Sequence, residues 1–212
     1  MLRHVQRFWT SDSNDALECQ TIQWGMSYFF PPEVMGAHIG AECCHSSGRR
    51  HQIGFRGLIA LPRYMGIELD PLKSDETERA AFKHYVELHK QWRSLLHQGR
   101  SVRLETLNPE RVRAQAMIGE QVAVVIVAQL TTPEYAMSEA LKIPYLKRDR
   151  QYRVMVVDRP KAIGDETHTM RKQVPWMAQA NYVVSGEWLG KAGLRLPQMG
   201  PESAMMLVLA EV

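Results

Sequence analysis

The periodicity of the sequence changes at Gly99. Over residues 75–97, apolar side chains recur every three or four positions, which is the spacing of one face of a helix. Ser74 is a good N-cap for that helix, and Gly99 suits its C-terminal end. Beyond Gly99, apolar and polar residues alternate, as they do in strands. We therefore expect two domains, an α/β domain over residues 1–98 and an all-β domain over residues 99–212.

The first part alternates short strands with helices. Residues 5–9 are apolar and aromatic, like a buried strand, and residues 34–40 predict a second strand. Helical spacing covers residues 15–29, before a pair of prolines, and residues 51–66 predict another helix with a kink at Pro62. Two strands do not make a closed parallel sheet. We therefore expect this part to be an incomplete α/β domain.

The second part consists of short apolar runs separated by turn residues. The predicted strands lie at residues 112–118, 122–130, 152–156, 182–189 and 204–212. Strands of this length and spacing are typical of a small antiparallel β-sandwich.

Composition excludes several classes of protein. The 212 residues carry a formal net charge of only +3, and the basic residues are scattered, so we expect no nucleic-acid partner. No apolar run is long enough to cross a membrane, and the first residues, MLRHVQRFW, lack the apolar core of a signal peptide. Three cysteines, two of them adjacent, make a poor disulfide framework. We therefore expect a cytoplasmic protein.

Two carboxylates, Asp12 and Asp15, stand where the first predicted strand passes into a helix. Active sites of α/β folds lie at this edge of the sheet, and an acid there can act as a general acid. Trp9 precedes the pair and could stack on the apolar face of a sugar. The alternative is structural, with Asp15 capping the helix and Asp12 forming a turn.

A group of possible metal ligands follows the second predicted strand. Its members are His38, Cys43, Cys44, His45 and His51. Their spacing fits none of the usual zinc-site patterns. We expect a loop with buried thiols and a packed histidine, and neither a metal nor a cofactor.

Three motifs together resemble one enzyme family. The stretch FWTSDSNDALECQTIQWGMSYFFPPEVMGAHIG matches the pattern W-x-S-D-x-x-D-A-x-E/D-R-x-x-I-Q-x-G and its continuation, and HSSGR and YMGIELD follow it. The chain resembles the α-galactosidases of glycoside hydrolase family 36. The resemblance is strong over residues 3–100 and weak beyond, where VVSGEWLGKAGLRLP is similar to the family's closing β-module.

The resemblance implies a role for individual residues. Asp12 matches the catalytic acid/base of the family, Trp9 a sugar-contacting tryptophan, and Asp15 a second acid with a supporting role in substrate binding. His38 would lie on the last barrel strand, from where we expect it to reach the substrate. The sequence departs from the family pattern at Cys19, where an arginine is usual.

Further departures lie near the same motif. Ser13 and Asn14 replace an Asn-Thr pair, Trp24 stands where a charged residue is common, and Cys43 and Cys44 replace loop proline or alanine. None of these changes removes the acid. They leave the fine specificity open.

The resemblance also implies what the chain does. It would form the C-terminal part of a (β/α)8 TIM barrel followed by the β-sandwich. The whole enzyme would be a retaining α-galactosidase that acts on melibiose-type or raffinose-type oligosaccharides. The family's nucleophile lies in a Lys-Trp-Asp motif, which does not occur in this chain. We expect the chain alone to be inactive, and to form homo-oligomers or to require the N-terminal part of the enzyme. The alternatives are a non-catalytic remnant or interaction module, an α-N-acetylgalactosaminidase and a galactosyl transferase.

Overall fold

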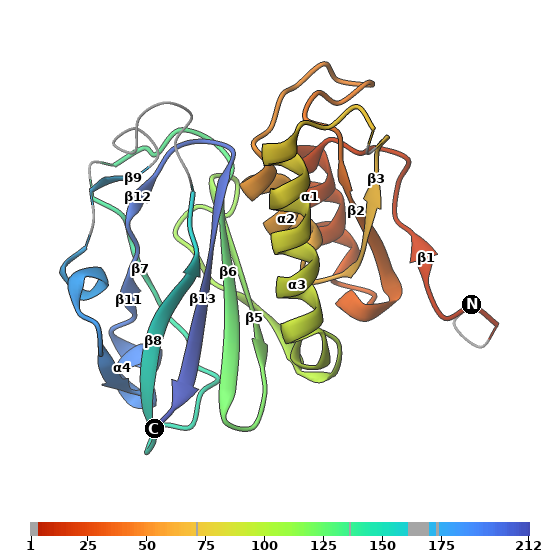
Figure 1. Ribbon diagram of the computed structural model, residues 1–212. Helices are drawn as coiled ribbons and strands as arrows, with labels where there is room; N and C mark the ends of the chain where they lie inside the picture. The colour runs from red at the N-terminus through yellow and green to blue at the C-terminus, as the bar shows by residue number, and fades with distance from the viewer. Residues whose placement is uncertain (1–3, 71, 136, 161–169, 173) are drawn as a thin grey trace. The chain divides into compact units, whose positions relative to one another are not determined.

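The computed structural model describes residues 4–70, 72–135, 137–160, 170–172 and 174–212 (Figure 1). They form two compact units, Met1–Gln98 and Gly99–Val212. The first unit combines helices with a parallel sheet, and the second is built mainly from antiparallel strands. Among the described residues, no helix combines the length and the hydropathy that crossing a membrane would require.

The first unit contains a three-stranded parallel sheet. Its strands are, in spatial order, β1 (Phe8–Trp9), β2 (Met35–Gly40) and β3 (Tyr64–Glu68). The helices are α1 (Ala16–Met26), η1 (Pro32–Val34), α2 (Ile53–Ala60) and α3 (Glu76–Gln98). Successive strands are neighbours, so right-handed connections place α1 and α2 on the same face of the sheet, and α3 packs against α2 (Figure 1).

The third strand corrects the sequence prediction of only two. Residues 51–66 do not form one kinked helix, because α2 ends at Ala60 and β3 begins at Tyr64. Pro62 accounts for the difference, since proline offers no amide hydrogen and disfavours helical geometry in the residue before it. It therefore ends the helix and lets the chain return to the sheet.

Of the two other predicted helices, one is confirmed and one is shorter than predicted. The helix predicted over residues 75–97 is confirmed as α3. The helix predicted over residues 15–29 ends earlier, at Met26, and Phe29 is 78% exposed rather than part of a buried face. The Ser27 amide donates to Gln23 and closes the last turn, so the helix ends before the prolines are reached.

The second unit contains a six-stranded antiparallel sheet. Its strands are, in spatial order, β10 (Val183–Ser185), β8 (Gln151–Asp158), β13 (Ser203–Glu211), β6 (Val122–Gln129), β5 (Val112–Ile118) and β4 (Arg100–Leu104). Two smaller pairs join β7 (Ala140–Leu141) to β11 (Leu194–Arg195) and β9 (Met170–Lys172) to β12 (Gln198–Met199). The short helices are η2 (Pro175–Ala178) and α4 (Gly186–Lys191).

The strands β4, β7, β9, β11 and β12 were not predicted, whereas four of the five predicted strands are confirmed, as β5, β6, β8 and β13. The exception is the segment 182–189, which is a strand only as far as Ser185 and then becomes α4. The Ser185 side chain accepts a hydrogen bond from the Trp188 amide and so caps this helix. A capping serine inside an apolar run is the local signal that the strand prediction missed.

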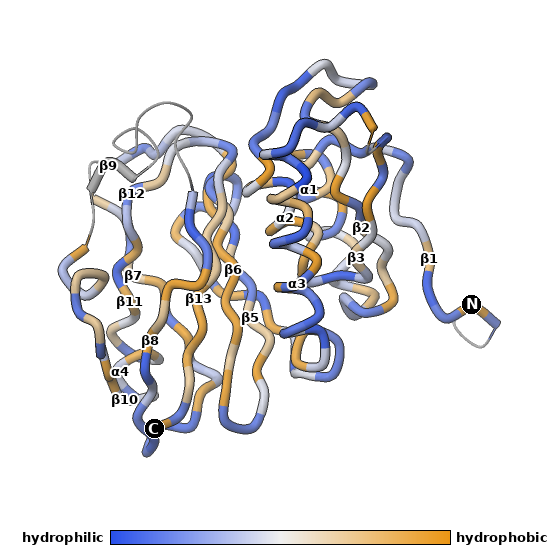
Figure 2. Tube along the Cα trace, in the orientation of Figure 1, coloured by the Kyte–Doolittle hydropathy of each residue, from blue (hydrophilic) through white to orange (hydrophobic). Residues whose placement is uncertain are grey.

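The core of the second unit lies on one face of the large sheet. Inward side chains of β5, β6 and β13 pack with residues of the smaller strands and of η2, such as Leu141, Leu194 and Trp176. Figure 2 shows hydrophobic residues along most of β6 and β13. On the opposite face of β6, Val124 and Ile126 are also buried, at 0% and 3% exposure. Burial on both faces explains why β6 is an unbroken apolar run in the sequence.

Candidate active site

One face of the parallel sheet carries a row of functional side chains. Met35, Ala37 and Ile39 of β2 are buried, so His38 points to the opposite face, away from the helices. Trp9 pairs with Gly36 in the register of β1 and β2. Both Trp9 and His38 stand near the carboxyl ends of their strands, where α/β folds bind ligands.

Trp9 and His38 pack against each other. Their ring centroids are 4.2 Å apart, and the rings are inclined by 48°. Two glycines make this possible: a Cβ at Gly36 would lie 2.6 Å from the Trp9 ring, and a Cβ at Gly66 would lie 2.6 Å from the His38 ring. Trp9 remains 40% exposed, so part of its surface is free to contact a ligand.

His38 is held by a residue that the sequence did not indicate. Its Nδ1 lies 3.2 Å from a carboxylate oxygen of Glu68, the last residue of β3. The carboxylate fixes the orientation of the ring and favours a proton on Nδ1. Since β3 was not predicted, no sequence signal placed Glu68 beside His38.

Asp12 lies on the loop that connects β1 to α1. Its side chain is exposed, while Ser11 and Ser13 on either side are partly buried. The Ser11 hydroxyl accepts a hydrogen bond from the Ser13 amide, and the Ser13 hydroxyl donates to Glu18. The loop is thus braced around Asp12, and the carboxylate itself is left open to solvent.

Asp15 has no exposed surface and accepts four hydrogen bonds. One oxygen caps α1 by accepting from the amides of Leu17 and Glu18. The other accepts from the Ser47 hydroxyl and from the Arg49 guanidinium, the latter at 3.0 Å. The capping role foreseen for Asp15 is therefore present, together with a tie to a loop more than thirty residues away.

The loop that meets Asp15 is a tight turn. The Gly48 amide donates to the Cys44 carbonyl, and the Cys44 amide donates to the Arg49 carbonyl. Gly48 has a φ of +72°, which other residues rarely adopt. This turn places Ser47 and Arg49 beside Asp15. The HSSGR motif, residues 45–49, therefore supplies the partners of an acid in the first motif.

A second contact joins the same two loops. Asn14 lies within hydrogen-bonding distance of the His45 ring, at 3.3 Å, and accepts from the Cys44 thiol. Asn14 and Asp15 therefore fasten the acidic loop on both sides of its passage into α1. This fastening fixes the position from which Asp12 projects.

Two ionisable groups near the loop have shifted pKa values. Burial raises the pKa of Asp15, but the hydrogen bonds from Ser47 and the Glu18 amide outweigh it, and the pKa is lowered overall. Burial, together with the negative charge of Asp15, raises the pKa of the Cys19 thiol to about 12. Cys19 thus stays protonated and donates to the Ser13 carbonyl, so it braces the loop where the family pattern has an arginine.

A small cavity lies beneath this row of side chains. It has a volume of about 10 Å³ and is lined by residues that include Trp9, His38 and Gln23. Gln23 is 2% exposed, and its carbonyl oxygen has no hydrogen-bond partner among the described residues. A space of this size holds one water molecule, which would satisfy that oxygen.

The possible metal ligands do not converge. His38 pairs with Glu68, the Cys44 thiol donates to Asn14, and the buried His51 packs against Phe55. Within the part of the chain that the structure describes, no three His, Cys, Asp or Glu residues are arranged to hold a metal ion.

Comparison with known proteins identifies the family. The family model described as Melibiase matches residues 1–99. An α-galactosidase of Escherichia coli is 44% identical over 213 residues, which is 99% of this chain and 30% of that relative. The solved GH36 α-galactosidase AgaB from Geobacillus stearothermophilus aligns over all of this chain and 26% of its own, with a TM-score of 0.82 and 28% identity.

The chain belongs to the α-galactosidases of glycoside hydrolase family 36. A variant of AgaA from Geobacillus stearothermophilus, solved in complex with raffinose, aligns with a TM-score of 0.82 and 26% identity, over all of this chain and 27% of that one. This family member thus spans about 30% of the length of its E. coli relative, and its relatives are glycoside hydrolases.

Four residues were singled out in the sequence, and the structure brings three of them, Trp9, Asp12 and His38, to one side of the parallel sheet. This is the side and edge where α/β enzymes bind ligands. Trp9 and His38 are in contact, and Asp12 follows Trp9 on the adjoining loop. Asp15 is set apart, buried beneath the loop. The residues that sequence reasoning missed are Glu68, Ser47, Arg49 and Gln23. All four lie within the motifs of the family resemblance: Gln23 in the first stretch, Ser47 and Arg49 in HSSGR, and Glu68 in YMGIELD. Those motifs were the available signal, although they did not indicate which contacts these residues make.

Proposed function

We propose that this chain supplies the general acid/base of a retaining α-galactosidase, with Asp12 in that role. The observation that carries the proposal is the exposed Asp12 carboxylate on a loop that Asn14 and Asp15 fasten at the end of β1. The adjoining Trp9 ring offers an apolar surface to a sugar, and His38 offers a nitrogen, with both placed by packing rather than left mobile. These are the elements that acid/base chemistry on a galactoside requires.

The wider fold follows from the same proposal. The βα units of residues 1–98 would form the C-terminal part of a (β/α)8 barrel, and residues 99–212 a C-terminal β-sandwich. Parallel strand order and helices on one face of the sheet support the first assignment. One six-stranded antiparallel sheet packed against smaller strands supports the second. The free thiols of all three cysteines are in keeping with a cytoplasmic setting.

The mechanism needs a second carboxylate. In a retaining glycosidase two carboxyl groups stand about 5–5.5 Å apart, and one of them attacks the anomeric carbon. Asp12 would donate its proton to the leaving glycosidic oxygen and then take a proton from the attacking water. Asp15 cannot be the nucleophile, because its oxygens are buried and already accept four hydrogen bonds. The nucleophile would come from another part of the enzyme, since the family's Lys-Trp-Asp motif does not occur in this chain.

Asp15 and Trp9 would support the reaction in different ways. Asp15 would position the loop without touching the sugar. Trp9 would contact the ring, and Nε2 of His38, whose Nδ1 faces Glu68, would accept a hydrogen bond from a substrate hydroxyl. The proposed substrates are α-galactosides of the melibiose and raffinose type, since raffinose is bound by a solved relative.

The isolated chain should not hydrolyse α-galactosides at a useful rate, because it lacks a nucleophile. The test is to incubate purified chain with raffinose and with an aryl α-galactoside and to measure galactose release. The Asp12→Asn chain is the matched control for contaminating enzyme. A robust rate in the original chain that Asp12→Asn abolishes would refute the argument for a missing nucleophile.

The isolated chain should also self-associate. Trp9, Tyr64 and Ile67 of the parallel sheet are 40%, 41% and 43% exposed, and β3 is an edge strand. An exposed edge strand with apolar side chains tends to pair with a strand of another chain. A lysine on that strand opposes the pairing. Sedimentation velocity should show concentration-dependent oligomers that Ile67→Lys reduces. A single monomeric species at every concentration would contradict the proposal that this sheet is incomplete.

A further inference from the structure

The second unit contains a cavity far from the row of Trp9 and His38 in sequence. Its volume is about 360 Å³, within the range of small-molecule sites. Three separate segments build it: residues 107–112 before and at the start of β5, residues 129–135 and 137–139 between β6 and β7, and residues 195–199 at β11 and β12. The proposed hydrolysis assigns no task to this cavity.

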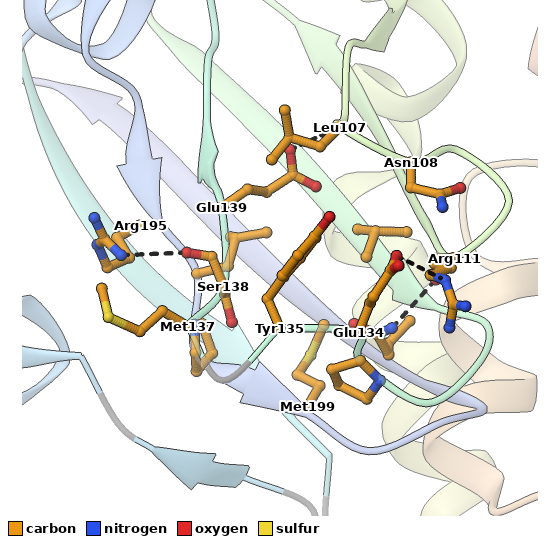
Figure 3. A pocket seen from close by; sticks show the side chains of 15 residues that line it. Leu107, Asn108, Arg111, Glu134, Tyr135, Met137, Ser138, Glu139, Arg195 and Met199 are labelled. Atoms are coloured by element: carbon orange, nitrogen blue, oxygen red, sulfur yellow. Dashed lines mark hydrogen bonds and ion pairs between the residues drawn. The ribbon is translucent and has the colours of Figure 1, made fainter.

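The floor and wall of the cavity are apolar. Leu196 and Met199 form a buried base, at 3% and 2% exposure. Above them Tyr135 and Met137 are 66% and 64% exposed. Figure 3 shows the Tyr135 ring standing between Glu139 on one side and Glu134 on the other. An exposed tyrosine beside a concave apolar surface is suited to packing against the flat apolar side of a ligand.

The rim of the cavity is polar, and its side chains are held in place. Glu139 accepts a hydrogen bond from the Leu107 amide at 2.7 Å. Arg111 donates to the Thr132 carbonyl at 2.8 Å and pairs with Glu134 at 3.4 Å. Side chains fixed before binding lose little conformational entropy when a ligand arrives.

Further contacts fix the remaining parts of the rim. Arg195 donates to the Ser138 carbonyl (Figure 3). The side-chain amide of Gln198 donates to the Tyr135 carbonyl at 3.1 Å. The backbone that carries the tyrosine ring is thus tied to the strand opposite, and the ring stands on a fixed base.

The charges of the rim define the ligand class. Arg111 and Arg195 contribute two positive charges, and Glu134 and Glu139 two negative ones, so the sum is zero. A site with balanced charges does not favour an anion or a cation. Carboxylates can accept hydrogen bonds from the hydroxyls of a neutral polyol, and guanidinium groups can donate hydrogen bonds to them. An apolar wall with such a rim matches a molecule that has one C–H face and many hydroxyls.

We infer that this cavity binds a neutral saccharide, with a hexopyranose lying against Tyr135 and its hydroxyls bonded to Glu139 and neighbouring rim groups. The site would hold the sugar without acting on it, because Glu134 is paired with Arg111. Glu139, which accepts one bond from Leu107, keeps acceptor positions for sugar hydroxyls. It would hold an oligosaccharide on the second unit. The choice of raffinose as the probe rests on the proposed function.

The test measures binding of raffinose to the full chain by amide chemical shifts in NMR, so no hydrolysis is needed. Raffinose should shift the resonances of residues 134–139 and 195–199. Tyr135→Ala should weaken binding at least about tenfold, because the stacking surface is removed, whereas Tyr135→Phe, which keeps the ring, should bind within about threefold. Tyr145→Ala is the control, since Tyr145 is 42% exposed in the same unit but does not line the cavity.

Three results would overturn the inference. The first is no shift in the second unit at about 50 mM raffinose, a concentration well above millimolar dissociation constants. The second is binding that Tyr135→Ala leaves unchanged but Trp9→Ala removes, which would place the sugar at the candidate active site alone. The third is self-association that Tyr135→Ala, and not Tyr145→Ala, abolishes in sedimentation experiments, which would make the cavity an interface between copies. Loss of the proposed hydrolytic function would leave raffinose binding at Tyr135 intact, so the two failures are distinguishable.

Discussion

Replacing Asp12 by asparagine is expected to reduce raffinose hydrolysis by about 10²–10⁴-fold in an enzyme that contains this chain. Because the chain spans only 30% of its E. coli relative, the assay uses a chimera in which this chain replaces the matching segment of that α-galactosidase. Asparagine keeps the shape of the side chain but cannot donate a carboxylic proton to the leaving oxygen. The loss should therefore appear in kcat.

The leaving group separates acid catalysis from other effects. An aryl α-galactoside with an acidic phenol needs little protonation, so the Asp12→Asn chimera should lose much less kcat/KM, which reports the first displacement, on that substrate than on raffinose. Asp149→Asn is the matched control, because Asp149 is 80% exposed in the second unit, and it should leave both rates unchanged. Equal losses of kcat/KM on the two substrates would contradict a role for Asp12 as the general acid.

Replacing Asp15 by alanine is expected to lower the free energy of unfolding of the chain by about 3 kcal/mol. The change removes the N-cap of α1 and the acceptor of the bonds from Ser47 and Arg49. Urea unfolding followed by far-UV circular dichroism measures the difference. Asp12→Ala is the control, since Asp12 is exposed and three residues away, and it should change stability little.

The contribution of Asp15 should depend on pH. Its pKa is lowered in the folded chain, from 3.8, so its stabilisation is fully present above the unfolded pKa and is lost as the pH falls through the folded pKa. The difference in unfolding free energy between the original chain and Asp15→Asn should be constant at neutral pH. It should shrink only below about pH 4. A difference that shrinks near neutral pH would show that another group is responsible.

Sequence periodicity predicted the elements whose stability is local. The predicted cap of α3 was wrong by one residue, since Asp75 and not Ser74 accepts the capping bond, from the Glu78 amide. The apolar stripe nevertheless predicted α3 to within one residue at each end, because the helical period repeats over many turns of a long amphipathic helix. β3 was missed for the opposite reason. Only five residues long, with Gly66 at its centre and Tyr64 exposed, it depends on pairing with β2 rather than on its own pattern.

The candidate site was predictable only where a motif is contiguous. Trp9, Asp12 and Asp15 lie within seven residues and were found together. The partners that give Asp15 its role, Ser47 and Arg49, are more than thirty residues away and meet it only through the fold. Neither spacing nor composition encodes such a contact.

The cavity of the second unit had no sequence signal at all. Its lining comes from three short loop segments that lie far apart in the chain. Tyr135 lies in a polar stretch between strands, which a pattern analysis treats as connection. Its significance follows from the buried floor of Leu196 and Met199 beneath it.

The most direct test of the central claim, that Asp12 is the acid/base and another carboxylate is the nucleophile, is azide rescue of the Asp12→Gly chimera. With an aryl α-galactoside, azide should attack the anomeric carbon of the galactosyl-enzyme ester, displace the nucleophilic carboxylate and restore turnover. Two displacements at that carbon retain its configuration, so the account predicts α-galactosyl azide as the product. β-Galactosyl azide, formed by a single displacement, would contradict it by making Asp12 the nucleophile.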